Sequence, residues 1–220
     1  MAGSVVLIDH HKVGPVRAFK VLATGDIATG AIPTTSLQSL GLGDVHGKLL
    51  AVQTNPKPAA TAITLANPSA AADDIIDTST AHGFVAGTPI RFKALTGGAG
   101  LAIDTIYYVV ATSLAAQTFR ISDTLGGDPI GFTTNITAGS VTADFFDPPT
   151  DNYDLTLIDA DGFDRLNSVG VDRDTATTER AAVTGVPYIA QGEVTSLTFA
   201  NNSVKCGAVE ITVTYTPFYL

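Results

Sequence analysis

The chain has 220 residues, with 12 Lys and Arg against 21 Asp and Glu, so its formal net charge is −9 at pH 7. This charge would repel a phosphate backbone, and the basic residues are scattered singly, which argues against nucleic-acid binding. Hydrophobic residues make up 45% of the chain and charged residues 15%, so a packed core is feasible and a disordered chain is excluded.

The sequence gives no sign of export or of a membrane segment. The N-terminus meets Asp9 after a short apolar run and has no basic leader, so we expect no signal peptide. The apolar run Ile106–Ala111 is six residues long, far below the roughly 20 that a membrane-spanning helix needs. The single cysteine, Cys206, has no disulfide partner in the chain, so we expect a buried, unreactive thiol and synthesis in a reducing cytoplasm.

Short strand patterns follow one another along the whole chain. Most are rich in Val, Ile, Thr, Tyr or Phe and are bounded by Gly, Pro, Asn or Asp. The expected strands, in chain order, are Val5–Asp9, Arg17–Ala23, Lys48–Thr54, Ile63–Ala66, Ile75–Ser79, Ile90–Ala94, Thr105–Thr112, Thr118–Ser122, Ser140–Phe145, Tyr153–Ile158, Glu193–Ala200 and Ala208–Thr216. In the last of these, apolar residues alternate with Glu and Thr, which predicts one core face and one solvent-exposed face in an antiparallel sheet.

Helix signals are weak in comparison. The segment Thr34–Leu40 has the signals for one or two helical turns, started by Pro33 and stopped by Gly41. The segment Arg173–Val183 contains several β-branched threonines, which lower helix propensity, so we interpret it as a long ordered loop. The chain is therefore predicted to be all-β.

Two proline-rich segments without periodicity, Asn55–Ala62 and Asp147–Thr150, divide the chain. We predict a discontinuous outer domain, residues 1–58 plus 150–220, with an antiparallel β-sandwich or jelly-roll-like fold. Residues 59–149 would form a small all-β module inserted at a loop tip, where insertions are tolerated. The segments that flank this module are expected to pair as a hairpin. The alternative is a single continuous β-sandwich, since all-β domains of this length occur.

Three carboxylates, Asp159, Asp161 and Asp164, are the nearest approach to a metal site. They offer hard oxygen ligands to Ca²⁺, but an EF-hand loop needs Gly at its sixth position and Glu at its twelfth. Here Gly162 is fourth and Gly170 is twelfth. Asp-Gly is also a preferred pair in a type I′ hairpin turn. We therefore predict a turn, keep the three Asp residues as weak metal candidates, and expect no metal and no cofactor.

The other polar residues form no catalytic pattern. His10 and His11 are adjacent on a strand, so their side chains point to opposite faces and do not easily chelate one ion. His82 lies in a turn rich in Gly and Pro, and His46 precedes a strand. No G-x-S-x-G sequence occurs, and neither Gly-rich segment is followed by the Lys-Ser/Thr of a phosphate loop. The chain is therefore predicted not to be an enzyme.

Paired acids and exposed loops suggest two rival functions. Asp151 with Asp154, or Asp172 with Asp174, would be the carboxylate pair of a glycosidase. Such clefts usually carry aromatic platforms, and the chain has no Trp. The loop 151–153, with its Asp, Asn and Tyr, would suit a module that binds host glycans, and this function stays as an alternative.

Two sets of motifs resemble structural proteins of tailed bacteriophages. The first is Ala81-His82-Gly83-Phe84 followed by the sequences GTPIRF, YYVV and TFRIS, which together are similar to a module found in several kinds of virion protein. The second set is Gly47–Pro56, Thr150–Gly162 and Asp172–Glu179, which resemble a small family encoded among phage head genes.

The resemblance implies a non-enzymatic structural protein of the virion. Its most specific form is a head decoration, or cement, protein on the capsid exterior, made in the host cytoplasm. The implied partners are the major capsid protein and further copies of the chain in a homotrimer, with no nucleic acid and no membrane. A tail or baseplate component is the first alternative, and a host-glycan-binding appendage is the second.

Overall fold

The computed structural model describes residues 2–27, 29–42, 45–66, 69–149, 152–166, 170–173, 177–184, 188–189, 195–200 and 207–217. These residues form β-strands joined by turns and irregular segments, and no α-helix lies among them. Adjacent strands of each sheet pair antiparallel. The predicted all-β fold with antiparallel sheets is therefore confirmed.

The chain divides into two compact units. Met1–Ala59 with Phe146–Leu220 makes the first, which we call the sandwich unit. Ala60–Phe145 makes the second, which we call the inserted unit. Each unit has a hydrophobic core of its own. The expectation from the sequence placed the limits between the units at residues 58–59 and 149–150.

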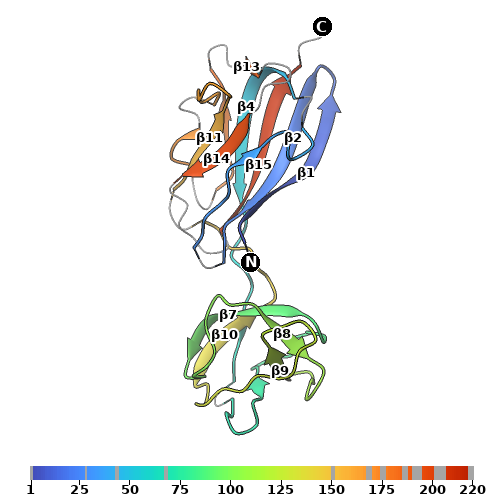
Figure 1. Ribbon diagram of the computed structural model, residues 1–220, viewed down its shortest axis with the longest axis vertical. Helices are drawn as coiled ribbons and strands as arrows, with labels where there is room; N and C mark the ends of the chain where they lie inside the picture. Colours follow the sequence, from blue (N-terminus) through green and yellow to red (C-terminus); the bar gives the residue numbers. More distant parts are fainter. Residues whose placement is uncertain are drawn as a thin grey trace. The chain divides into compact units, whose positions relative to one another are not determined.

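The sandwich unit contains a larger and a smaller sheet. The larger has the strand order β1-β2-β15-β4-β12, and β13 also pairs with β4 (Figure 1). The smaller has the order β11-β14-β3. The strands of the larger sheet are β1 (Ser4–Val13), β2 (Val16–Thr24), β4 (Gly47–Pro56), β12 (Glu179–Ala182), β13 (Tyr188–Ile189) and β15 (Ala208–Thr216). Those of the smaller sheet are β3 (Thr35–Ser36), β11 (Asp154–Ile158) and β14 (Ser196–Ala200).

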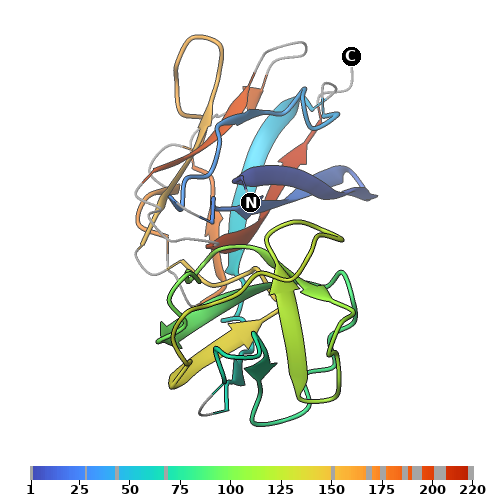
Figure 2. The ribbon, with the colours of Figure 1, turned by 60° about the horizontal axis from the view of Figure 1, so that its bottom comes forward.

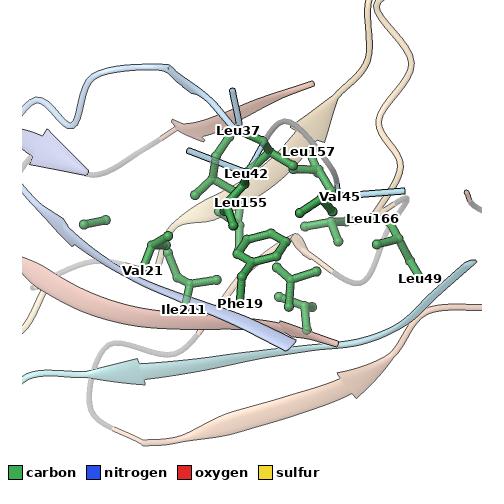
Figure 3. Packing of buried hydrophobic residues seen from close by; sticks show 14 of the residues in the cluster. Phe19, Val21, Leu37, Leu42, Val45, Leu49, Leu155, Leu157, Leu166 and Ile211 are labelled. Carbon is green, nitrogen blue, oxygen red and sulfur yellow. The ribbon is translucent and has the colours of Figure 1, made fainter. Parts of the chain in front are cut away.

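The two sheets enclose one core because apolar residues occupy alternate positions of their strands. In β15, Val209, Ile211, Val213 and Tyr215 are buried, whereas the Glu and Thr residues between them are half-buried. Figure 3 shows Phe19, Val21 and Ile211 of the larger sheet across the core from Leu155 and Leu157 of β11. Burying each large apolar side chain in this way contributes about 1.5–3 kcal/mol.

The segments that flank the inserted unit do not form the predicted hairpin. β4 lies in the larger sheet between β15 and β12, whereas β11 lies in the smaller sheet beside β14. Both strands present apolar side chains to the same core, among them Leu49 and Leu155. They therefore pack face to face across that core instead of pairing edge to edge.

Three short strands lie outside the predicted set. β3 occupies part of the segment expected to be helical, and its Ser36 is opposite Ser196 of β14. The residues after it form consecutive turns, in which the Leu42 N–H donates to the Leu37 carbonyl at 2.8 Å. β12 lies in the segment interpreted as a loop and pairs with β4, and β13 pairs with the start of β4. In each case pairing with a sheet edge outweighs the weak local preference of the sequence.

The inserted unit is one curled sheet of six strands in the order β5-β10-β7-β8-β9-β6. Its outer strands also meet: the Ser79 N–H donates to the Thr64 carbonyl at 2.9 Å, and the Ala66 N–H donates to the Asp77 carbonyl at 2.8 Å. The inward residues fill the interior, as in a small barrel. The strands are β5 (Ile63–Thr64), β6 (Ile76–Asp77), β7 (Pro89–Thr96), β8 (Tyr107–Val110), β9 (Thr118–Ser122) and β10 (Ala138–Thr142).

Candidate functional site

The three metal candidates lie in the hairpin that follows β11. The Asp159 N–H donates to the Phe163 carbonyl at 3.1 Å, and the Gly162 N–H donates to the Asp159 carbonyl at 3.1 Å. Gly162 has φ +85°, whereas Asp161 has no positive φ. The predicted turn is therefore present, but it is a three-residue connection that ends on a left-handed glycine and not a type I′ turn, which needs two positive φ values.

Two of the three carboxylates, those of Asp159 and Asp164, accept donors of the chain itself, whereas Asp161 is exposed. Asp159 is 5% exposed, and its Oδ1 accepts the N–H groups of Asp161 at 3.0 Å and Phe163 at 2.8 Å. Its other oxygen contacts the Arg165 guanidinium. The Asp164 Oδ1 accepts the N–H groups of Leu157 and Leu166, both at 3.0 Å. In the described part of the chain, no group of three or more His, Cys, Asp or Glu side chains is arranged to hold a metal ion.

His10, His11 and His82 each contact another side chain or a backbone group of the chain. The His10 Nε2 lies 2.9 Å from the Tyr215 hydroxyl, and the His11 Nδ1 lies 2.8 Å from an Asp9 carboxylate oxygen. His82 is buried, and its Nδ1 accepts the Phe84 N–H at 2.9 Å. The His82 ring also stacks on Phe84 and meets Phe119 edge-on, with centroids at 4.7 and 5.2 Å. The His-Gly-Phe motif is therefore a packed corner of the inserted unit.

Two buried arginines, Arg91 and Arg173, were not predicted from the sequence to have a role. Arg91 is 1% exposed; its Nη1 donates to the Asp104 carboxylate at 3.0 Å and its Nε to the Asp144 carbonyl at 3.2 Å. The guanidinium also lies over the Phe145 ring, 5.9 Å from its centroid. Such a pair is costly to bury but fixes one arrangement of the groups around it. Through its contacts with Asp144 and Phe145, Arg91 joins the end of the inserted unit to strand β7.

Arg173 connects separate segments of the sandwich unit in a similar way. It is 5% exposed; its Nε donates to the Thr54 hydroxyl at 3.1 Å and its Nη2 to the Glu179 carbonyl at 2.9 Å. Its backbone exchanges two hydrogen bonds with Tyr153. Arg173 therefore connects the segment that precedes β11 to the strands β4 and β12. The signal that could have found it is its place within the motif Asp172–Glu179.

One member of each acid pair considered for a glycosidase, Asp154 and Asp172, helps to hold a loop together. The Asp172 N–H donates to the Asp154 Oδ1 at 2.9 Å, and the Asn152 Nδ2 donates to the Asp172 Oδ1 at 2.9 Å. Asp172 has φ +56°, which an aspartate tolerates better than most residues. Asp151, Asp174 and Cys206 lie outside the described residues.

One hollow of about 340 Å³ opens on the inserted unit. Its lining comes from the end of β8 and from the turns on either side of it, including Gly87, Val110, Leu125 and Asp128. Leu125 is 68% exposed at its rim. Apolar and backbone groups dominate this lining, so the hollow offers shape and apolar contact, with Asp128 as its one charged side chain.

Exposed apolar side chains of the sandwich unit follow strand β1. Val6, Ile8 and Val13 are 51%, 48% and 68% exposed. Among the strands that the structure describes, β1 is the first of its sheet and pairs only with β2. A strand with one unpaired edge and exposed apolar side chains is a surface on which another chain can pair. We call Ser4–Val13 with its unpaired edge the β1 edge.

Among the described residues, no helix has the length and apolar character needed to span a bilayer.

Comparisons of this chain with protein-family models, with curated proteins and with solved structures found no match.

Proposed function

We propose that the chain is a non-enzymatic structural protein of a tailed-phage virion, and that it decorates the capsid exterior as a cement protein. The sandwich unit would contact the major capsid protein, and the inserted unit would be displayed to solvent. In this function the protein acts through a protein–protein contact that is repeated over the capsid lattice. Repetition multiplies modest affinities, so no single contact needs to be tight.

The observation that supports the proposal is that the polar side chains of the described residues hold turns and strands together. Asp159, Asp164 and Asp172 accept backbone or side-chain donors in turns, and Arg91 and Arg173 join strands. Meanwhile apolar side chains remain exposed along the β1 edge. Groups that stiffen a scaffold, combined with an exposed strand edge, suit a protein that acts by contact rather than by chemistry.

The resemblance to phage proteins supports the same proposal through the roles of its motifs. Gly47–Pro56 is the whole of β4, in the interior of the larger sheet. Thr150–Gly162 contains β11 and the Asp159 hairpin, and Asp172–Glu179 contains Arg173. These motifs form the frame of the sandwich unit, which is the part we assign to the capsid contact.

We further propose that the chain assembles as a homotrimer. The outward faces of β15 and β11 carry half-buried threonines, among them Thr212, Thr214 and Thr156. Such half-polar faces can be covered by a second subunit, and the charged groups beside Thr212, Glu210 and Lys20, already pair with each other. Closed cyclic symmetry is the usual arrangement of such assemblies.

The test uses undecorated heads of the phage that encodes the chain. Purified protein is added, bound protein is measured by sedimentation, and the heads are then heated or shocked osmotically. We expect saturable binding and greater resistance to both treatments. Antibody labelling of complete virions should mark the head. Labelling of the tail alone would replace the decoration role with the tail or baseplate role, and binding only to host glycans would replace both.

A further inference from the structure

Two cations face each other on the β1–β2 hairpin. Lys12 of β1 lies directly opposite Arg17 of β2, and Arg17 lies directly opposite Tyr215 of β15. Residues opposite each other in an antiparallel pair share a face of the sheet and lie close, so two like charges at these positions destabilise the pair. A pair of like charges that destabilises the hairpin, and that no ion pair among the described residues offsets, indicates a place where a ligand could bind.

Neither cation is neutralised within the described chain. Lys12 is exposed, and within the described ranges neither Lys12 nor Arg17 forms an ion pair. The Arg17 Nε is buried and has no hydrogen-bond acceptor. In contrast, Lys20 and Lys57 on the same sheet share the Glu210 carboxylate. In a protein with net charge −9, unpaired cations on one hairpin are positioned for a partner's acids.

His10 lies on the same face as Lys12 and Arg17. It is opposite Phe19, which points into the core, and its ring contacts Tyr215. In Figure 2 the hairpin extends to the right, away from the strands of the smaller sheet. The cations therefore lie where the larger sheet reaches past the smaller one, beside the exposed Val13.

We propose that the β1 edge binds an extended, carboxylate-bearing segment of another protein, which pairs along β1 and places its acids at Lys12 and Arg17. The unpaired edge of β1 supplies main-chain hydrogen bonds, and Val6, Ile8 and Val13 supply apolar contacts. The charge of the rest of the chain repels an acidic partner elsewhere and steers it to this hairpin. The identity of the partner rests on the proposed function, which makes it a capsid protein; the chemistry of the site does not.

The first experiment uses a short fluorescent peptide that alternates Val and Glu, the full-length protein, and fluorescence anisotropy. We expect binding that weakens with added salt. The double variant Lys12→Gln/Arg17→Gln should bind at least about tenfold more weakly. It should melt no lower than the wild type, because the change removes a repulsion. The control is Arg180→Gln, which removes an exposed cation from β12 at the far side of the same sheet, and its binding should be unchanged.

Several results would overturn the inference. Absence of peptide binding would do so, and so would equal loss in the Arg180 variant. Tighter binding of a peptide that alternates Val and Lys, or of a single-stranded oligonucleotide, would contradict an acidic protein segment as the occupant. Self-association of the wild-type protein that the double variant abolishes would make a second copy the occupant.

A second experiment separates this inference from the proposed function. Undecorated heads are mixed with the wild type and with the double variant. Equal binding of both would show that the capsid protein is not the occupant of this site and would leave the decoration role standing. Peptide binding by the wild type without any binding to heads would overturn the decoration role and leave the acidic-segment site standing.

Discussion

Lys57 and Asp147, which are 90 residues apart in the chain, hydrogen-bond to the same residue. The Lys57 N–H donates to the Ala208 carbonyl at 2.9 Å, and the Ala208 N–H donates to the Asp147 carbonyl at 2.8 Å. Ala208 is the first residue of β15 and is fully buried. The chain therefore leaves the sandwich unit and returns to it at one point on one strand.

This arrangement predicts that the inserted unit can be removed. Deletion of Ala60–Phe145, with Ala59 joined to Phe146, leaves both hydrogen bonds to Ala208 in place. We expect a folded β protein with a cooperative thermal transition, measured by circular dichroism. A chain without a cooperative transition would contradict two independent units and favour a single continuous sandwich.

A longer deletion provides the control for this experiment. Removing Lys57–Asp147 eliminates both partners of Ala208 and also the contact of Lys57 with Glu210. The Ala208 N–H and carbonyl then lose their bonds in a buried setting, which costs about 1–3 kcal/mol for each group left unsatisfied. We expect this product to unfold at lower urea concentration than the shorter deletion, and equal midpoints would show that the Ala208 bonds are not what holds the linkers.

A second prediction concerns the Asp159 hairpin. Asp159→Ala removes the acceptor of two backbone N–H groups and leaves Arg165 without its carboxylate. We expect a loss of about 2–3 kcal/mol in the free energy of unfolding, measured by urea denaturation. The exposed Asp161→Ala is the matched control and should lie within about 0.5 kcal/mol of the wild type.

The same hairpin should be indifferent to metal. EDTA should leave the melting temperature of the wild type unchanged, because backbone N–H groups and Arg165 already occupy the carboxylates of Asp159 and Asp164. A melting temperature that falls with EDTA and recovers with Ca²⁺ in the wild type, and does neither in Asp159→Ala, would establish a metal site instead of a turn.

The strands were predictable because their signal is local. Every segment with alternating apolar residues contains a strand, and the alternation in β15 predicts which side chains are buried. The partner of each strand was not predictable in the same way. β4 and β11 have equally good patterns, and nothing in either shows that the two lie in different sheets of one sandwich.

In the candidate site, too, features set by neighbouring residues were predictable from the sequence, and features set by residues far apart in the chain were not. The Asp159 turn could be expected from its Asp-Gly pair, although the loop is one residue longer than the type I′ turn allows. Arg91 reads as an ordinary surface cation because its partners, Asp104 and Phe145, come from distant positions. The opposed Lys12 and Arg17 become visible only once the register of the β1–β2 hairpin is known.

The proposed homotrimer makes a direct prediction about mass. Light scattering on the purified protein should give three times the chain mass of 22.6 kDa. The expected interface covers half-polar faces such as that of Thr212 and Thr214, so replacing both with Lys should lower the mass by placing charge in it. A monomer at high concentration, with or without this change, would contradict a trimer in solution.

The last prediction concerns Glu210 and pH. Burial alone would raise the pKa of Glu210, but hydrogen bonds and charges from Lys20 and Lys57 outweigh it and lower this pKa from 4.5 to about 2. Because the pKa is lower in the folded than in the unfolded chain, the ionised carboxylate stabilises the fold above pH 4.5. That contribution is lost as the pH falls from 4.5 toward 2.

Glu210→Gln should therefore cost about 1 kcal/mol in the free energy of unfolding at pH 7, the upper range for partly exposed ion pairs. The difference from the wild type should shrink as urea titrations are repeated at falling pH from 4.5, and most of it should be lost near pH 2. Other carboxylates titrate alike in both proteins, so the difference isolates Glu210. Since Lys57 lies two residues before the point at which the chain leaves the sandwich unit, the wild type at low pH should also become easier for an acid-active protease to cleave near Lys57. A difference between the two proteins that stayed constant from pH 7 to pH 2 would mean that Glu210 acts through packing and not through its charge.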